Sequence, residues 1–318
     1  MNRTRLNEII FLGFPNLHHF NYFMFIIVLI IFIVTINGNA LITVLVSTSS
    51  LLRSPMFIFL GHLSFSDMLL SSNIVPGMLH MLLFNGATFS FGGCILQVFV
   101  YGTSAATECL LLTVMSYDRY LAICKPLHYT MIMNLKLCLQ LVALSWMIGL
   151  GTTLKTILLL QTLWFCGPNV IDHFFCDMGP LLGLSCSDVS IVNYELFAFS
   201  SLVTILPFIF ITFTYVHIFL TILRITSVTG RQKTFSTCSS HLAIVCTYYG
   251  SLFAMYVVPS KEKTPTVSKM VSLLYVVVTP LCNPIIYSLR NTEIKSAIWK
   301  YLSVCKKLQE NQHGMHLA

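Results

Sequence analysis

The chain has 318 residues, of which 56% are hydrophobic and only 9% are charged. Its mean hydropathy is +0.82, and soluble domains carry roughly 25% charged residues. This composition excludes a protein in contact with water on all sides, and it favours one helical membrane bundle over two soluble domains. The formal net charge of +7 comes from bases dispersed over short loops, which membrane topology explains better than nucleic-acid binding.

Apolar runs near the ~20 residues needed to cross a bilayer recur along the chain. The polar start MNRTRLNEII does not resemble a cleaved signal peptide, so we expect the first run to act as its own insertion signal. The predicted fold is an all-α membrane protein: one seven-transmembrane helix bundle over 22–289, then a tail at 290–318 that begins with a short amphipathic helix. The predicted spans are 22–48, 56–81, 94–121, 137–162, 193–223, 237–259 and 267–289.

The loop charges predict the orientation of the bundle. One side carries twelve Lys and Arg but three acids, whereas the other carries six of each. The positive-inside rule makes the first side cytoplasmic, so residues 1–21 are predicted to be extracellular. The sequon Asn2-Arg3-Thr4 agrees with this orientation, because Asn2 is a glycosylation site only outside the cytosol.

Two carboxyl groups lie at bilayer depth, Asp67 in the second span and Glu108 in the third. Each charge there costs at least ~2.5 kcal/mol, and both cannot stay ionised without a cation or a shared proton. Asn39, Ser64 and Asn283 would add neutral oxygens to a Na⁺ site. A protonated carboxyl that only holds helices together is the equally weighted alternative.

The third span closes on the triplet Asp118-Arg119-Tyr120. We hypothesise that Asp118 holds Arg119 in one state and releases it in another. The alternative is an interfacial arginine whose apolar stem lies along the membrane surface.

Four of the eleven cysteines, Cys94, Cys166, Cys176 and Cys186, fall on the predicted outer side, where disulfides persist. Three pairings are open, and the residues alone do not rank them. A zinc site at His173, Cys176 and Asp177 is disfavoured, because cysteine intervals of ten residues are far from metal-ligand spacing.

Prolines mark the later spans, with Pro207 in the fifth and Pro280 and Pro284 in the seventh. Each removes a backbone hydrogen bond and can kink its helix, which favours a bundle that flexes.

These features together resemble a rhodopsin-like G protein-coupled receptor: seven spans, Cys94 at the outer end of span three, Asp-Arg-Tyr at its inner end, Asp67, and NPIIY at 283–287. A more specific resemblance covers essentially the whole chain. The segments PMFIFLGHLSFSDML, MSYDRYLAICKPLHY, CGPNVIDHFFCD, KTFSTCSSHLAIV and PLCNPIIYSLRN are similar to those of vertebrate olfactory receptors.

The resemblance implies disulfides Cys94–Cys176 and Cys166–Cys186, no catalytic activity and no cofactor beyond a candidate Na⁺. It also implies a plasma-membrane protein of olfactory cilia that couples to a heterotrimeric G protein of the Golf/Gs type and raises cAMP. Arg119 would contact that protein once Tyr215 and Tyr287 swing toward it. The span landmarks are Asn39, Asp67, Trp146, Pro207 and Pro284, and the implied activation residues are Asp118, Arg119, Tyr120, Tyr215, Tyr249, Asn283, Pro284 and Tyr287.

Span six has CTYYG at 246–250, where olfactory receptors usually show Phe-Tyr-Gly, so Tyr248 is a small departure beside the toggle residue Tyr249.

The implied ligand positions carry no charge, which suits a small, volatile, mostly apolar odorant with one or two hydrogen-bonding groups. Tyr101, Ala105 and Glu108 share one helix face by their spacing, and an aspartate at Tyr101 would have suggested an amine. The implied positions are Tyr101, Gly102, Ala105, Ala106, Phe199, Ser200, Val203, Leu252, Phe253 and Tyr256.

Other classes fit the sequence less well. The runner-up is a non-olfactory rhodopsin-like receptor for a small molecule or peptide. A transporter would show polar residues along several spans or paired half-repeats. An intramembrane enzyme would need a nucleophile with its base, or a metal motif such as His-Glu-x-x-His.

Overall fold

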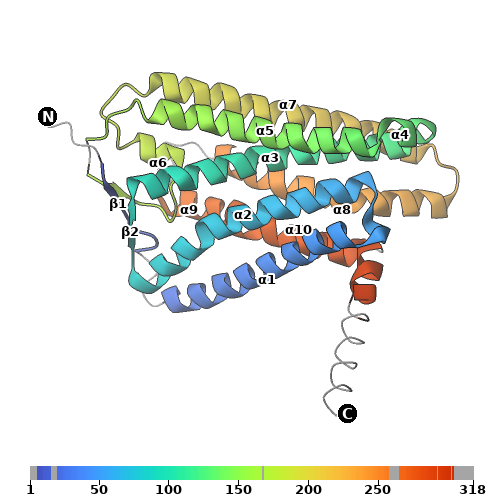
Figure 1. The fold of residues 1–318 in the computed structure, drawn as a ribbon, viewed down its shortest axis with the longest axis horizontal. Coiled ribbons are helices and arrows are strands. Elements are labelled where there is room, and N and C mark those ends of the chain that lie inside the picture. The colour runs from blue at the N-terminus through green and yellow to red at the C-terminus, as the bar shows by residue number, and fades with distance from the viewer. Residues whose placement is uncertain are drawn as a thin grey trace, which may run out of the picture.

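The computed structural model describes residues 6–15, 20–166, 168–257, 265–291, 293–301 and 303. Long helices run alongside one another, and a small sheet caps one end of the bundle (Figure 1). We call this end the sheet end, and the opposite end, which carries α4 (Pro126–Ile132), the α4 end.

All seven predicted spans form helices in the described chain, and residues 258–259 of the sixth span lie outside it. Their ends agree with the prediction within three residues, except that the sixth helix begins nine residues earlier. The long helices are α1 (Asn21–Thr48), α2 (Pro55–Phe84), α3 (Phe91–Cys124), α5 (Leu135–Leu160), α7 (Ser190–Leu223), α8 (Val228–Val257), and a seventh built from α9 (Pro265–Leu273), the π-helical turn η3 (Leu274–Val278) and α10 (Thr279–Arg290). Two short elements, η2 (Ser50–Leu52) and α6 (Met178–Leu182), lie in connections.

Six helical stretches of the described chain are long and apolar enough to cross a membrane. The helix outside this set is α8, which is of similar length but opens with the polar run VTGRQKTFSTCSSH. That polar run explains why the predicted sixth span starts only at residue 237.

Local signals set several helix ends. The side chain of Ser90 accepts a hydrogen bond from the backbone N–H of Gly93 and begins α3, and Asn134 accepts from Leu137 at the start of α5. Such caps satisfy N–H groups that a first turn leaves unpaired. At the other end of α2, Asn85 takes a left-handed conformation (φ 57°) and stops the helix.

The cap at the sheet end was not predicted from the sequence. Strand β1 (Glu8–Phe11) pairs antiparallel with β2 (Ala87–Ser90) and parallel with β3 (Val170–Ile171). Its residues alternate between exposed and buried, so Ile9 and Phe11 lie inside. Part of the segment expected to be only a polar extracellular terminus therefore closes one end of the bundle.

The bundle buries polar groups and exposes apolar ones, as a membrane protein does. Helix α3 is central and contacts α2, α5, α7 and α8. On α1, by contrast, Ile26, Ile30 and Ile33 are each more than half exposed, whereas Asn39 is fully buried. Apolar side chains on the outside of α1 suit contact with lipid.

The predicted helix after the last span is present at residues 293–301. Asn291 accepts hydrogen bonds from the backbone N–H groups of Glu293 and Ile294, which starts the helix. Ile294 is buried and Trp299 is exposed, and the helix turns away from the bundle axis (Figure 1).

Candidate functional site

The sheet end is tied together by two disulfides. Cys94–Cys176 joins the start of α3 to the loop between α5 and α7, and Cys166–Cys186 closes that loop on itself. These are the two pairings that the family resemblance implies. Cys176 is therefore bonded to sulfur, and the described residues contain no group of three His, Cys, Asp or Glu side chains that could hold a metal ion.

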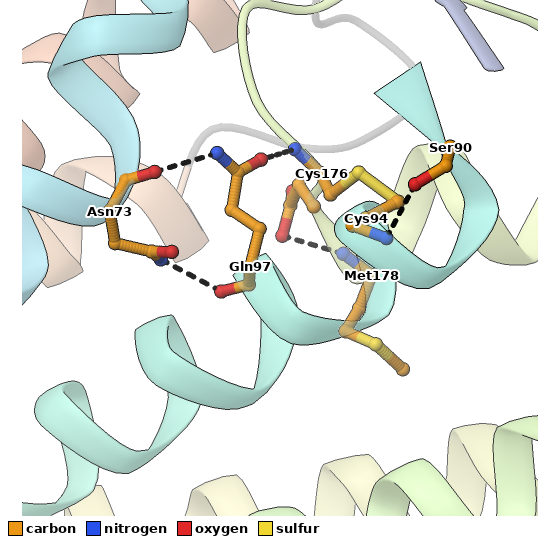
Figure 2. Close-up of a disulfide and its surroundings, with 8 residues drawn as sticks. Asn73, Ser90, Cys94, Gln97, Cys176 and Met178 are labelled. Carbon is orange, nitrogen blue, oxygen red and sulfur yellow. Dashed lines mark hydrogen bonds between the residues drawn. A yellow bond between two sulfur atoms is a disulfide. The ribbon is translucent and has the colours of Figure 1, made fainter. Parts of the chain in front are cut away.

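Gln97 fixes the disulfide loop to the helices (Figure 2). Its side-chain oxygen accepts from the backbone N–H of Cys176 (2.8 Å), and its amide nitrogen donates to the backbone oxygen of Asn73 on α2 (2.9 Å). The Asn73 side chain donates back to the Gln97 carbonyl at 2.9 Å. Sequence reasoning missed Gln97, although its place about one turn after Cys94 could have indicated it.

An aromatic and charged cluster lies beneath the strands. Phe14 stacks on Phe174 with ring centroids 5.4 Å apart, and Lys269 of α9 pairs with Asp172 at 2.5 Å. His173 is buried between the rings of Phe174 and Phe175. Burial, and then the nearby Lys269 charge, lower the pKa of His173 from 6.5 to about 4, so the imidazole is neutral at pH 7.

Several implied ligand positions meet below this cluster. Tyr101 of α3 lies against Phe175 (5.4 Å between centroids) and Tyr275 of η3 (6.0 Å). Ala105 accepts a hydrogen bond on its backbone oxygen from the Tyr248 hydroxyl at 2.8 Å. Three further members of the set, on α3, α7 and α8, are buried: Ala106, Val203 and Leu252.

Other implied ligand positions do not lie in the region around Tyr101 and Ala105. A Cβ at Gly102 would meet Thr153 of α5 at 2.9 Å, so Gly102 faces a neighbouring helix. Phe253 is 67% exposed and lies on the outside of the bundle. Phe199 and Ser200 are partly buried, and the side chain of Tyr256 lies outside the described set.

Three residues that sequence reasoning did not assign to the ligand site complete this region. The Tyr275 hydroxyl donates to Glu108 Oε2 at 3.5 Å. Cys109 Sγ lies 3.0 Å from both the Val203 carbonyl and the Tyr249 hydroxyl. The third is Tyr248, whose departure from the usual Phe was the one available signal. Together they link α3, α7, α8 and η3 through phenol, thiol and carboxyl groups.

A buried polar layer lies deeper, around Asp67. Asn283 donates to Asp67 Oδ2 at 2.7 Å, and Asn39 donates to the Pro280 carbonyl at 3.1 Å. The buried oxygens that find no hydrogen-bond partner in the described chain include Asp67 Oδ1, Glu108 Oε1, Ser64 Oγ, Asn39 Oδ1 and Asn283 Oδ1. Oxygen atoms of this kind are what a hard cation prefers, so the set fits the predicted Na⁺ site chemically.

At the α4 end, Asp118 holds Arg119 and one further residue. Its Oδ2 accepts from Arg119 Nε (2.9 Å) and Nη2, and its Oδ1 accepts from the Tyr129 hydroxyl of α4 at 2.8 Å. Burial and the neighbouring Asp118 raise the pKa of Tyr129, so its phenol remains a proton donor. The segment MSYDRYLAICKPLHY, from which the family resemblance was drawn, ends at Tyr129, but the sequence did not predict that Tyr129 binds Asp118.

The other activation residues occupy separate places. The Tyr215 hydroxyl lies 2.6 Å from His241 Nδ1, with the two rings stacked, so α7 is tied to α8. The Tyr287 hydroxyl is buried and unpaired within the described chain. A Cβ at Gly38 would meet Pro284 at 2.9 Å, so α1 and α10 are in close contact there.

Two remaining tyrosines of the set face α7. The ring of Tyr120 meets the ring of His217 edge-on, with centroids 6.1 Å apart. The ring centroids of Tyr249 and Phe208 are 5.0 Å apart. Neither Tyr215 nor Tyr287 is bonded to Arg119, which agrees with an arrangement in which Arg119 is occupied by Asp118.

Comparisons with known proteins agree with this geometry. A family model described as olfactory receptor matches residues 28–306. Olfactory receptor 11L1 of Homo sapiens is 46% identical over 95% of this chain and 94% of its own length. Olfactory receptor 5G9 of Mus musculus is 43% identical over 98% of this chain and 99% of its own.

Among solved structures, squid rhodopsin has the same fold. Its TM-score is 0.71, it is 17% identical, and the match covers 90% of this chain and 87% of that one. At that identity the likeness speaks for the fold alone. The family model, the relatives and the seven-helix bundle lead to one conclusion. This multi-pass membrane chain belongs to the olfactory receptor family of G protein-coupled receptors, and it is a receptor rather than an enzyme.

Proposed function

We propose that this receptor binds a small, mostly apolar odorant between α3, α7, α8 and η3, in the half of the bundle nearest the sheet. The observation that carries the proposal is the uncharged cluster around Tyr101, Ala105, Cys109 and Tyr248. An apolar region with a phenol, a thiol and a few convergent hydroxyls suits a ligand with one or two hydrogen-bonding groups.

The sheet end is then extracellular and the α4 end cytoplasmic. Both disulfides lie at the sheet end, which suits an oxidising compartment, and the loop bases gather at the other end. The proposed location is the plasma membrane of olfactory cilia. Glycosylation at Asn2 belongs to this proposal, and Asn2 itself lies outside the described residues.

Activation is proposed to release the contacts at the α4 end. An odorant that favours outward movement of α8 would separate His241 from Tyr215. Tyr215 and Tyr287 could then move toward Arg119 as it leaves Asp118. A free guanidinium can donate to the carboxy-terminal helix of a Golf/Gs-type α subunit, and this coupling would raise cAMP.

A sodium ion at Asp67 and Glu108 is proposed to favour the resting arrangement. Glu108→Gln keeps an oxygen but removes one negative charge, so it should weaken any dependence of signalling on external Na⁺. Replacing Na⁺ with choline in the assay buffer tests this, with wild type as the control. A sodium response that is unchanged in the variant would favour a shared proton instead.

The proposed function is tested by an odorant panel on cells that express this chain with a Golf-type subunit. A cAMP rise to at least one small apolar odorant, lost in Ala105→Trp, is expected because an indole would fill the proposed site. Tyr194→Phe, at an exposed position on α7, serves as the control. A response only to peptides or to charged ligands would favour the non-olfactory alternative.

A further inference from the structure

A groove of about 610 Å³ lies between the end of α7 and the start of α8, and none of the residues that line it was assigned a role above. Ile222 forms its floor and is 4% exposed. Its walls are Phe219 and Leu223 of α7 and Phe235 of α8, each about half exposed. The groove therefore opens to the outer surface of the bundle, at the level where the predicted fifth span ends at residue 223 and the predicted sixth span begins at residue 237.

The rim of this groove is polar and cationic. Arg231 donates from Nη2 to the Ile225 carbonyl at 3.1 Å, which holds its guanidinium beside the end of α7. A guanidinium has five N–H donors, so this bond leaves donors for an oxyanion. Arg231 and Phe235 are four residues apart and share a face of α8. Along that face, Arg231 lies in the first turn of α8 and Phe235 lies one turn further along the helix.

The charge around the groove has one sign. Residues 196–261, which include all of α8 and most of α7, contain no Asp or Glu, whereas Arg224 and Arg231 flank the turn between the two helices. The first turn of α8 adds the partial positive charge of a helix amino terminus. An anionic group at the rim would thus meet no acid from either helix.

We propose that this groove binds an anionic phospholipid of the surrounding leaflet. Its phosphate accepts hydrogen bonds from Arg231 and from the hydroxyl of Ser236, and one acyl chain lies along Phe219, Leu223 and Phe235. A soluble anion would leave the apolar walls uncovered, and a zwitterionic lipid would bring its own ammonium group, which offsets the phosphate charge and adds a cation beside Arg231. Because the lipid touches both helices, it bridges α7 and α8 at the α4 end.

The test is photo-crosslinking of the full-length receptor in nanodiscs. Phosphatidylglycerol and phosphatidylcholine that carry the same diazirine acyl chain are compared, and labelled peptides are mapped by mass spectrometry. Labelling of Phe219–Leu223 and Phe235 should be about fivefold stronger with the anionic lipid, the ratio expected for one base near an anionic group. Equal labelling by the two lipids overturns the proposal.

Matched variants separate the groove from general surface charge. Arg231→Gln should remove the excess labelling, whereas Arg224→Gln removes the same charge outside the groove and should keep it. Ser236→Trp fills the groove without changing charge and should lower labelling by both lipids. The proposal fails if Arg224→Gln loses as much of the excess labelling by the anionic lipid as Arg231→Gln does. It also fails if Ser236→Trp, with an unchanged unfolding midpoint, is labelled as strongly as wild type.

Discussion

Asp118 is fully buried and uses both carboxylate oxygens, one for Arg119 and one for Tyr129. The first partner is its neighbour in sequence, so the pair could be predicted from the motif alone. The second partner is eleven residues away on a separate short helix, and Tyr215 and His241 are 26 residues apart. Contacts of that kind depend on how helices are rotated against each other, and a motif does not specify rotation.

Tyr248 offers a test that is particular to this chain. Its hydroxyl ties α8 to the Ala105 carbonyl of α3, and Tyr248→Phe removes this bond while it keeps the ring. A hydrogen bond of this kind contributes about 1 kcal/mol. If the bond is broken on activation, ligand-free cAMP should rise about fivefold, whereas Tyr194→Phe should change nothing. Unchanged basal cAMP in Tyr248→Phe would mean that the bond persists in both states.

His173 predicts how the stability of the loop at the sheet end depends on pH. Its pKa is about 4 in the fold and 6.5 when unfolded, so the unfolded loop binds more protons between these values. Stability therefore falls as the pH drops from about 6.5 toward 4. Lys269, Asp172 and Ser272 are the polar groups that face the ring.

Hydrogen exchange of residues 170–178 measures this effect. Exchange should accelerate between pH 6.5 and 4.5, after correction for the intrinsic rate, and His173→Phe should flatten the dependence. A wild-type loop whose protection does not change over that range would contradict the assignment.

Whole helices were predictable because apolar runs of bilayer length are long signals, and caps such as Ser90 are local. The sheet was not, because the four residues of β1 pair with segments about 80 and 160 positions away. The rotation of each helix about its own axis was also not predictable from the sequence. Residues that face lipid are as apolar as residues that face the bundle, which is why Phe253 could be assigned inward although the structure places it outside.

The disulfides make a prediction about the sheet end. Cys94→Ser or Cys176→Ser removes the bond that holds the loop to α3 and should abolish delivery to the cell surface. Cys246→Ser, at an exposed free cysteine on α8, is the matched control and should be delivered normally. Surface staining of intact cells, divided by total expression, measures the effect. Normal staining and signalling of either disulfide variant would show that this bond is dispensable.

At the scale of the whole molecule, three layers lie along the bundle. Aromatic and hydroxyl groups nearest the sheet end meet at Tyr101 and Tyr275, a polar layer surrounds Asp67, and an ion pair at Arg119 closes the α4 end. Helix α8 takes part in the first layer through Tyr248, and its His241 is bonded to Tyr215 of α7. A movement of α8 would therefore connect the proposed odorant site with the proposed G protein site.

The central claim is that Arg119 is held by Asp118 and acts when it is released. The most direct measurement is cAMP per receptor at the cell surface, with and without an activating odorant, for Arg119→Lys and Asp118→Asn. Lysine keeps the charge but lacks the planar guanidinium, so Arg119→Lys should lose most odorant-stimulated cAMP at normal surface level. Asp118→Asn should raise ligand-free cAMP. If Arg119→Lys signals like wild type and Asp118→Asn stays silent without ligand, Arg119 is only an interfacial anchor and this account is wrong.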